Sequence, residues 1–141
     1  MSINNIFGIA GSAMNAQMVR MNSTASNMAN ASTVAGSQEA AYKAKRPVFE
    51  ALLSEQQTNL RAPTVGGVKI AEMSEDSKPN SSVHDPGHPN ANEDGMVFLS
   101  NVNEVEEMVD MLAAARSYQN NVEVINTAKQ LMMKTLDLTK V

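Results

Sequence analysis

The sequence predicts a mainly α-helical protein, with one long helix at each end of the chain and a small β-containing middle region between them. Three observations lead to this fold class. Residues 102–140 contain neither Pro nor Gly and carry apolar side chains every three or four positions, which is the spacing of one helix face. Residues 3–31 repeat that spacing. Between them lie three short runs rich in Val, Ile and Phe, which are typical of strands.

The N-terminal helix is expected from about Ile3 to Ala31. Arg20 is the only charged side chain between Ile3 and Gln38, whereas a helix that faces solvent normally carries charges on its outer side. Small residues form a strip that would let another backbone approach, and two of them are glycines, which cost about 1 kcal/mol each in a helix. The helix could lie on the protein's own middle region, but a helix surrounded by protein on most sides is favoured. The strip consists of Gly8, Ala10, Gly11, Ser12, Ala13 and Ala16.

The first helix should end within residues 26–36, where Asn, Ser and Gly compete for backbone hydrogen bonds. Asn27 and Asn30 are three residues apart on its last turn. They could lock the exit of the chain by bonding main-chain groups, or they could be ordinary helix-stop residues.

The middle region is expected to hold strands at residues 48–53, 68–73 and 96–99, with Gly66-Gly67 as a turn between the first two. Residues 74–94 are rich in Ser, Pro, Asn and Asp and predict a long loop. His84 and His88 suggest a metal site, but two prolines prevent the helix that would bring both imidazoles together. A turn at Pro86-Gly87 is therefore the preferred interpretation, and no metal is expected.

The C-terminal helix is expected to be a rod about 55 Å long, longer than a small domain needs for its own core. Asn101 or Asn103 can cap its start, each with a Glu three residues later. Glu106, Glu107 and Asp110 are interpreted as partners of the helix dipole on a solvated face and not as catalytic carboxylates. Its apolar face comprises Val105, Met108, Leu112, Ala115, Tyr118, Val122, Ile125, Ala128, Met132 and Leu136.

These elements predict three regions: residues 1–33 as the N-terminal helix, 34–100 as the β and loop region, and 101–141 as the C-terminal helix. The two helices should pair as an antiparallel, coiled-coil-like hairpin, and their unequal lengths leave apolar surface for helices of other molecules. The predicted assembly interface consists of Ile3, Phe7, Gly8, Ala10, Gly11, Ala13, Met14, Met21, Asn27, Asn30, Val105, Met108, Leu112, Ala115, Tyr118, Val122, Ile125 and Met132.

The composition argues against several classes of function. A net charge of −4 with 18% charged residues offers no basic patch for nucleic acid or for an anionic membrane surface. Cys is absent, so a disulfide framework and a Cys nucleophile are excluded. Polar residues interrupt the apolar positions near the N-terminus, so neither a cleaved secretory signal nor a membrane span is expected there. We expect no catalysis and no cofactor.

Residues 25–33, Ala-Ser-Asn-Met-Ala-Asn-Ala-Ser-Thr, resemble the signature of bacterial flagellar rod and hook proteins, in which an Asn-x-x-Asn pair closes the first helix. Residues 42–45, 85–95, 100–109 and 116–121 look like the proximal-rod members of that family. The resemblance extends from Ile3 almost to the C-terminus. Many relatives continue the signature with Thr-Pro-Gly-Tyr, whereas an insertion containing Gly36 separates Thr33 from Tyr42 here.

The resemblance implies a structural subunit that leaves the cytoplasm through the flagellar type III export apparatus and polymerises in the periplasm. The terminal helices would then pack into a helical tube that transmits torque for motility. It implies as partners other copies of the chain and the rod proteins FlgB, FlgF, FlgG and FliE. A soluble coiled-coil adaptor or secretion chaperone, which would bind a partner helix in a groove, is the alternative.

Overall fold

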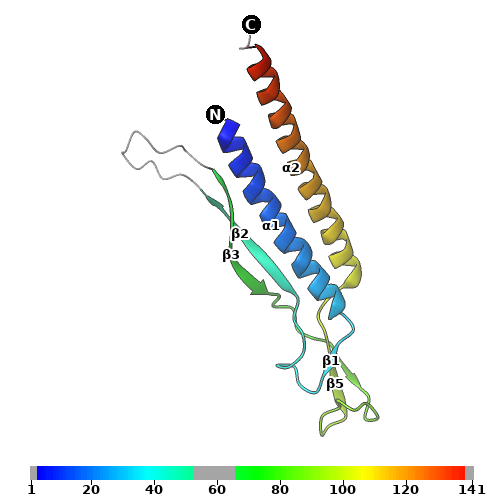
Figure 1. The fold of residues 1–141 in the computed structure, drawn as a ribbon. Coiled ribbons are helices and arrows are strands. Elements are labelled where there is room, and N and C mark those ends of the chain that lie inside the picture. Colours follow the sequence, from blue (N-terminus) through cyan, green and yellow to red (C-terminus); the bar gives the residue numbers. More distant parts are fainter. Residues whose placement is uncertain (1–2, 53–65, 139–141) are drawn as a thin grey trace, which may run out of the picture.

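The computed structural model describes residues 3–52 and 66–138 of the 141-residue chain and contains two long helices and a small antiparallel β region (Figure 1). Helix α1 spans Ile3–Ala29 and helix α2 spans Glu104–Leu138. Both predicted helices are confirmed within two residues at the ends that the structure describes. Residues 139–140, which the prediction placed in the second helix, lie outside the described residues.

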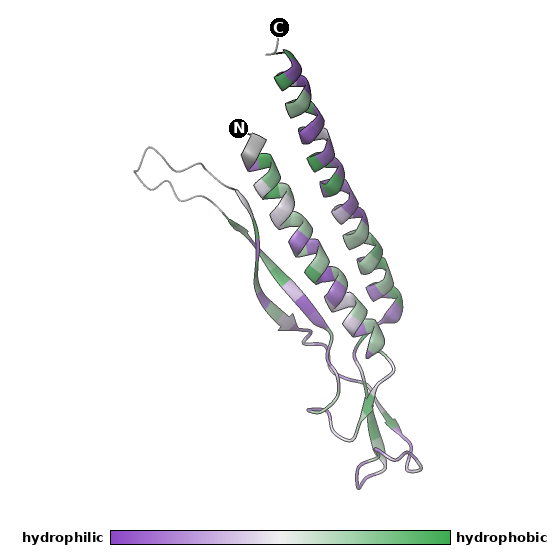
Figure 2. Cartoon of the chain, in the orientation of Figure 1, coloured by the Kyte–Doolittle hydropathy of each residue, from purple (hydrophilic) through white to green (hydrophobic). Residues whose placement is uncertain are grey.

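Helix α1 occupies the middle of the molecule. It runs side by side with α2 in the opposite direction, and the hairpin of β2 and β3 packs along it as well (Figure 1). The protein's own middle region therefore covers part of α1. Contact between this helix and the middle region was the less favoured of the two expectations. Apolar residues occur along the whole length of both helices (Figure 2).

Strands β2, Lys45–Leu52, and β3, Gly67–Glu75, pair antiparallel from Lys45 opposite Glu75 to Leu52 opposite Gly67. The predicted turn at Gly66-Gly67 is wrong, because Gly67 belongs to β3. The segment that joins the two strands, including Leu53, lies outside the described residues. Gly67 suits this position because an added Cβ would lie 2.8 Å from Ser12 Oγ on α1.

The second sheet lies beyond the end of α1 and has the strand order β1-β5-β4, all antiparallel. Its strands are β1, Val34–Ala35; β4, Ser82–His84; and β5, Met96–Leu99. The prediction of one long loop over residues 74–94 is wrong in two places, since β3 continues to Glu75 and β4 lies within that segment. Pairing with β5 satisfies the backbone of β4, so a polar sequence can be a strand there.

The described residues bury few large apolar side chains. The buried apolar residues are Ala10, Ala16, Ala41, Ala44, Val97, Ala114 and Ala128. The two largest fully buried side chains are polar, Glu107 and Asn27. Among the described residues, no helix is long and apolar enough to cross a membrane. The packing of α1 against α2 therefore depends on small residues and on a polar cluster where α1 ends and α2 begins.

Candidate functional site

The start of α2 is capped by Asn103, one of the two residues that the sequence left open. Asn103 Oδ1 accepts hydrogen bonds from the N–H of Val105 at 3.0 Å and of Glu106 at 3.4 Å, which satisfies two donors of the first turn. Asn101 serves the middle region instead. Its Oδ1 accepts from the N–H of Ala44 at 2.7 Å, and its Nδ2 donates to the carbonyl of Lys78 at 2.9 Å.

Asn27, in the last turns of α1, joins three separate parts of the chain. Its Nδ2 donates to the carbonyl of Lys45 and to Glu107 Oε2, both at 3.0 Å. Its Oδ1 accepts from the N–H of Lys45 at 2.9 Å and from the hydroxyl of Tyr42 at 3.0 Å. An amide offers two donors and two acceptor positions, and here all four are used. The expectation that Asn27 bonds main-chain groups is confirmed.

Asn30, the second Asn of the signature, has a more local role. Its Nδ2 donates to the carbonyl of Ser26 at 2.8 Å, and its own carbonyl accepts from the hydroxyl and the N–H of Thr33 at 2.7 and 3.2 Å. These bonds close the end of α1 on itself. The expectation that Asn30 bonds main-chain groups is therefore also confirmed. The main-chain group that its side chain bonds, the carbonyl of Ser26, belongs to the end of α1 itself.

Glu107 was predicted to lie on a solvated face of α2, and that prediction is wrong. Its residue is 1% exposed, with Oε2 bound to Asn27 and Oε1 at 3.3 Å from Arg46 Nη2. Oε1 has no hydrogen bond of good geometry within the described residues. The partner of this oxygen is therefore the positive charge of Arg46. A carboxylate can be buried here because an amide and a guanidinium meet it.

Three further ion pairs lie around Glu107. Asp110, one turn later, accepts from Arg46 Nη1 at 3.1 Å and from Arg20 Nη2 at 2.9 Å. Arg46 also lies 3.7 Å from Asp76. Arg20, the only charged residue of α1, thereby binds Asp110 of α2. We refer to Asn27, Glu107, Arg46, Asp110 and Arg20 as the polar hub.

The chain at residues 42–45 passes between the helices and the second sheet, and asparagines hold it. Asn27 binds Lys45 through both backbone groups. Asn101 accepts from Ala44, and Asn80 donates to the carbonyls of Tyr42 and Leu99 at 2.9 and 2.8 Å. The same residues 42–45 contributed to the family resemblance. Their backbone is one place where α1 is bonded to the middle region, and the N–H of Val68 on β3, which donates to Ser12 Oγ, is another.

The polar hub borders a cleft of about 260 Å³ that Ser23, Thr24, Pro47 and Phe49 also line. Its two carboxylates and two guanidiniums pair with one another. Such a cluster suits the joining of segments, because its ion pairs link α1, β2 and α2. Within residues 3–52 and 66–138, no group of three His, Cys, Asp or Glu side chains could hold a metal.

His84 and His88 lie in separate surroundings. His84 is the last residue of β4, and His88 Nδ1 accepts from the N–H of Asn90 at 3.1 Å. The predicted turn at Pro86-Gly87 is confirmed: the N–H of His88 donates to the carbonyl of Asp85 at 3.2 Å, and Asp85 Oδ1 accepts from the N–H of Gly87. This is a β-turn with an Asx-type bond at its first residue.

The residues of the predicted assembly interface have different surroundings within the subunit. Ala10 and Asn27 are buried, and Ile3 is the first residue of α1. Gly8, Val105, Met108 and Leu112 are exposed. The half-buried members are Phe7, Gly11, Ala13, Met14, Met21, Asn30, Ala115, Tyr118, Val122, Ile125 and Met132.

The apolar residues that the sequence analysis placed on one face of α2 do not all lie on one face. Their average spacing is shorter than the 3.6 residues of one helical turn. From Val105 to Leu136 they take nine steps over 31 residues, so the line that joins them winds by roughly 140° around a helix of 3.6 residues per turn. Its early members, such as Leu112, are exposed, and later ones, such as Ile125, are partly covered.

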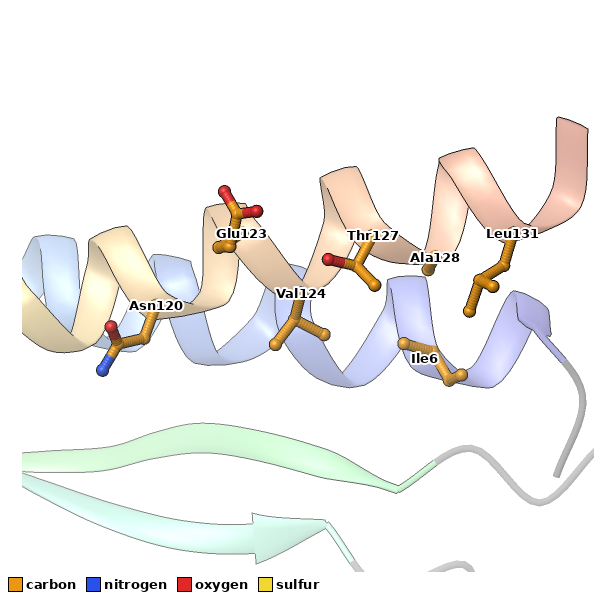
Figure 3. A pocket seen from close by; sticks show the side chains of 7 residues that line it. All are labelled: Ile6, Asn120, Glu123, Val124, Thr127, Ala128 and Leu131. Atoms are coloured by element: carbon orange, nitrogen blue, oxygen red, sulfur yellow. The ribbon is translucent and has the colours of Figure 1, made fainter. Parts of the chain in front are cut away.

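A groove between α1 and α2 near their other ends was not expected from the sequence. It measures about 410 Å³ and is lined by Ile6 of α1 and by Asn120, Glu123, Val124, Thr127, Ala128 and Leu131 of α2. Val124, Ala128 and Leu131 point from α2 toward α1, where Ile6 lies, whereas the carboxylate of Glu123 points away (Figure 3).

The polar hub was also missed, although one signal for Glu107 exists. Glu107, Met111, Ala114 and Tyr118 follow one another at spacings of four, three and four, which puts Glu107 on the same face as the residues packed against α1. A charge in that line indicates a partner on the neighbouring helix. That partner is Asn27 of α1, and the sequence contains no corresponding signal for the second partner, Arg46 of β2.

Comparison with known proteins agrees with this architecture. Residues 7–36 match the family described as flagella basal body rod protein, and residues 93–138 match the flagellar basal body rod FlgEFG protein C-terminal family. The flagellar basal-body rod protein FlgC of Yersinia enterocolitica is 47% identical over 138 residues, 98% of each chain. FlgC of Escherichia coli O157:H7 is 46% identical with the same coverage, and FlgC of Bacillus subtilis strain 168 is 33% identical over 94% of this chain and 95% of its own.

These matches confirm the resemblance to flagellar rod proteins that residues 25–33 and the later motifs indicated. They cover both helices and the region between them. With nearly half of its residues identical to those of a relative that it spans almost from end to end, the chain belongs to the FlgC family of flagellar basal-body rod proteins.

Proposed function

We propose that this chain is a structural subunit of the bacterial flagellar basal-body rod and that it polymerises through its two terminal helices. The observation that carries the proposal is the 47% identity to a basal-body rod protein over 98% of the chain. The relatives are structural rod proteins and not known enzymes, and the paired charges of the polar hub suit a structural role.

The surface of the subunit supports assembly. Large apolar side chains of α2 are exposed in the free subunit, among them Val105, Leu112, Leu131 and Leu138, each more than half exposed. Contacts with other subunits would remove this surface from water, and the hydrophobic effect would then stabilise the assembly.

The two helices form a coiled-coil-like hairpin in this proposal. On α1, Ala10, Ala13, Gln17, Arg20, Thr24 and Asn27 are buried or half-buried at spacings of three and four, and on α2 so are Glu107, Met111, Ala114, Tyr118, Asn121, Ile125 and Ala128. Alternating steps of three and four are the repeat of a coiled coil. Residues 1–33 and 101–141 form the polymerisation core, and residues 34–100 form a separate middle region.

We propose that the subunit belongs to the proximal rod, within the periplasm, and that it reaches this position through the flagellar export apparatus. Other copies and the rod proteins FlgB, FlgF, FlgG and FliE are its proposed neighbours. Two stiff helices joined at one end by the polar hub suit the transmission of torque, because the hub resists their separation. The comparisons do not favour the alternative of a soluble adaptor or secretion chaperone.

The test is genetic and biochemical. A strain of the source bacterium that lacks this gene should not swim, and the intact gene supplied on a plasmid should restore swimming. Basal bodies purified from the restored strain should contain the chain by mass spectrometry. An adaptor or chaperone would remain in the cytoplasmic fraction, so basal bodies without the chain would contradict the rod assignment.

A further inference from the structure

One side of α1 faces the hairpin of β2 and β3, which runs along the helix (Figure 1). Ser12, Ala16 and Ser23 lie on this side, at spacings of four and seven residues. The hydroxyl of Ser23 donates to the carbonyl of Lys45 on β2, and Ser12 Oγ accepts from the N–H of Val68 on β3 at 3.2 Å. Ala16, between the two serines, is 3% exposed. The hairpin therefore covers a stretch of α1 that contains two members of the strip of small residues.

We propose that this hairpin is a cover for one side of α1, that it stays closed in the assembled rod, and that Ser12 and Gly67 are the residues that position it. The inference rests on the proposed function and adds a task for the part of the middle region farthest from the polar hub. A closed cover keeps neighbouring subunits away from the side of α1 that carries Ser12 and Ala16.

The hydroxyl of Ser12 is oriented to accept a bond from the hairpin. It donates to the carbonyl of Ile9 at 2.8 Å, one turn earlier in α1, and this bond leaves the oxygen free to accept from the N–H of Val68. In a two-stranded antiparallel sheet, every second N–H points away from the partner strand. Such edge groups can pair with the strands of other chains. Ser12 thus satisfies an outward N–H of β3 within the subunit.

Gly67 is explained by space and not by backbone conformation. Among the described glycines, the one with a positive φ is Gly95, so the backbone at position 67 would accept other residues. A Cβ added to Gly67 would, however, lie 2.8 Å from Ser12 Oγ and 3.5 Å from Ser12 Cβ. The hydroxyl cannot turn away without breaking its two hydrogen bonds. Gly67 therefore allows the backbone of β3 to lie directly on Ser12.

The hairpin is held at its base independently of Ser12 and Gly67. Asn27 and Ser23 bond the backbone of Lys45, and Arg46 pairs with carboxylates of α2. Ser12 and Gly67 meet about 15 residues of α1 earlier, which is roughly 22 Å along the helix from Asn27. A change at either residue should therefore loosen the far end of the cover and leave the polar hub in place.

The close contact predicts that one substitution suppresses another. Gly67→Ala should lower the thermal midpoint of the purified chain and speed amide exchange at Val68, because the new methyl group meets Ser12 Oγ. Ser12→Ala removes that oxygen and leaves a Cβ at 3.5 Å, an ordinary contact. The double variant should therefore be more stable than Gly67→Ala alone. Gly66→Ala is the matched control and should behave as the parent, since its Cβ would meet Ile9 Cδ1 at 3.7 Å. Simple addition of the two single effects would overturn the roles assigned to Ser12 and Gly67.

Disulfide trapping tests whether the cover stays closed in the rod, and the natural chain contains no Cys. The variant carries Ser12→Cys and Gly67→Cys, whose Cβ atoms would be 3.5 Å apart, as a disulfide requires. Mild oxidation of purified basal bodies should consume both thiols and leave the chain as a monomer of 15.1 kDa. Ser12→Cys with Glu72→Cys is the control. Glu72 is exposed on β3, five residues and about 16 Å beyond Gly67, so both thiols of this control should remain free.

The outcome separates this inference from the proposed function. Basal bodies that contain the Ser12→Cys and Gly67→Cys chain with both thiols still free would show that the hairpin leaves α1 in the rod. A disulfide-linked dimer would show that these positions face another subunit. Either result would overturn the cover and leave the rod assignment intact. If this variant does not assemble, Ile9→Cys with Gly66→Cys replaces it. Absence of the unmodified chain from basal bodies would overturn the proposed function itself.

Discussion

At position 27, an amide is the side chain that the surroundings require. Lys45 offers both a carbonyl and an N–H, Tyr42 offers a hydroxyl, and Glu107 offers a carboxylate oxygen. Asn supplies two donors and two acceptor positions for these four partners. An Asp would lose both donors and would place a second negative charge against Glu107. A Leu would remove the bond that Asn27 makes to each of these groups, and of the two Lys45 groups the carbonyl would keep its bond from the Ser23 hydroxyl.

Asn27→Ala should therefore lower the stability of the hub end of the molecule by about 2–3 kcal/mol, the cost of leaving buried polar groups unsatisfied. Asn30→Ala is the matched control from the same Asn-x-x-Asn signature. Its side chain donates one bond to Ser26 and is partly exposed, so the expected cost is about 1 kcal/mol or less. The measurement is the thermal midpoint of the purified chain by circular dichroism. Equal shifts for the two variants would contradict the role assigned to Asn27.

The hub also shows what the sequence can predict at this scale. The sequence left two interpretations of Asn27 and Asn30 open, and the structure confirms the one in which they bond main-chain groups, as short amides near a helix end commonly do. It could not predict Glu107 as a partner of Asn27, since acidic residues in a first helical turn are explained well by the dipole alone. The buried pair depends on how α1 and α2 are aligned, which is a property of the tertiary structure.

At the scale of one element, α1 separates two kinds of small residue. Ala10 is 2% exposed within the subunit. Gly11 is half-buried, and a Cβ added there would meet nothing within 4 Å. Ala10 and Gly11, neighbours in the strip of small residues, thus have different structural roles. Ala10 sets the packing inside the subunit, and Gly11 leaves room on its surface.

Gly11→Leu and Ala10→Leu should consequently act at different stages. Ala10→Leu should destabilise the isolated subunit by about 1–3 kcal/mol through overpacking. Gly11→Leu should leave the subunit as stable as the parent or slightly more so, because Leu is the better helix former by up to about 1 kcal/mol. If another backbone comes close to Gly11 in the rod, as the proposed interface requires, Gly11→Leu should still prevent incorporation. The two measurements are the thermal midpoint and the amount of chain in isolated basal bodies.

Normal incorporation of Gly11→Leu would show that this part of α1 stays free in the rod. A loss of stability in the isolated subunit as large as that of Ala10→Leu would show instead that the position is already filled. Either result would remove Gly11 from the proposed interface.

The elements themselves were predicted unevenly. Both helices followed from apolar spacing, because a helix face imposes its period on the sequence. Strand β4 was missed because Ser82 and His84 have no apolar alternation, and their pairing with Phe98 and Met96 of β5 depends on a partner 12 or more residues away. The groove at Ile6 and Val124 was missed for the same reason, since two distant segments create it.

At the scale of the whole molecule, the polar hub lies at one end of the helix pair, where α1 ends and α2 begins, and the other ends of the helices are far from it (Figure 1). Leu131, Met133, Leu136 and Leu138 of α2 are all more than half exposed. Few contacts oppose the ordering entropy of about 1–2 kcal/mol per residue there. The isolated subunit is thus expected to be only partly folded before it assembles.

Amide hydrogen exchange on the dilute chain should reveal a gradient. Protection should be strongest near Asn27 and Glu107, where hydrogen bonds and ion pairs join α1, β2 and α2. It should fall toward Ile6 on α1 and toward Leu131 on α2. Assembled rods should show protection along both helices. Strong, uniform protection of both helices in the dilute monomer would mean that the subunit needs no neighbours for its fold.

The last prediction concerns the whole rod and uses two adjacent residues of α2. Val122 is half-buried in the free subunit, and Glu123 is exposed with its carboxylate directed away from α1 (Figure 3). If neighbouring helices cover Val122 in the rod, an Asp there becomes a buried charge without a partner in every copy, at a cost of several kcal/mol each time. In the free subunit, water can still reach that Asp. Val122→Asp should therefore block rod growth while synthesis and export of the chain continue.

Glu123→Gln is the matched control, one residue later and about 100° around the helix, and it should assemble normally. Secreted subunit and isolated basal bodies are measured in parallel for both variants, because a subunit that is exported but not incorporated is the result expected for Val122→Asp. Intact rods built from the Val122→Asp chain would show that this face of α2 remains in water after assembly. The polymerisation core would then have to be sought on α1 and in the middle region.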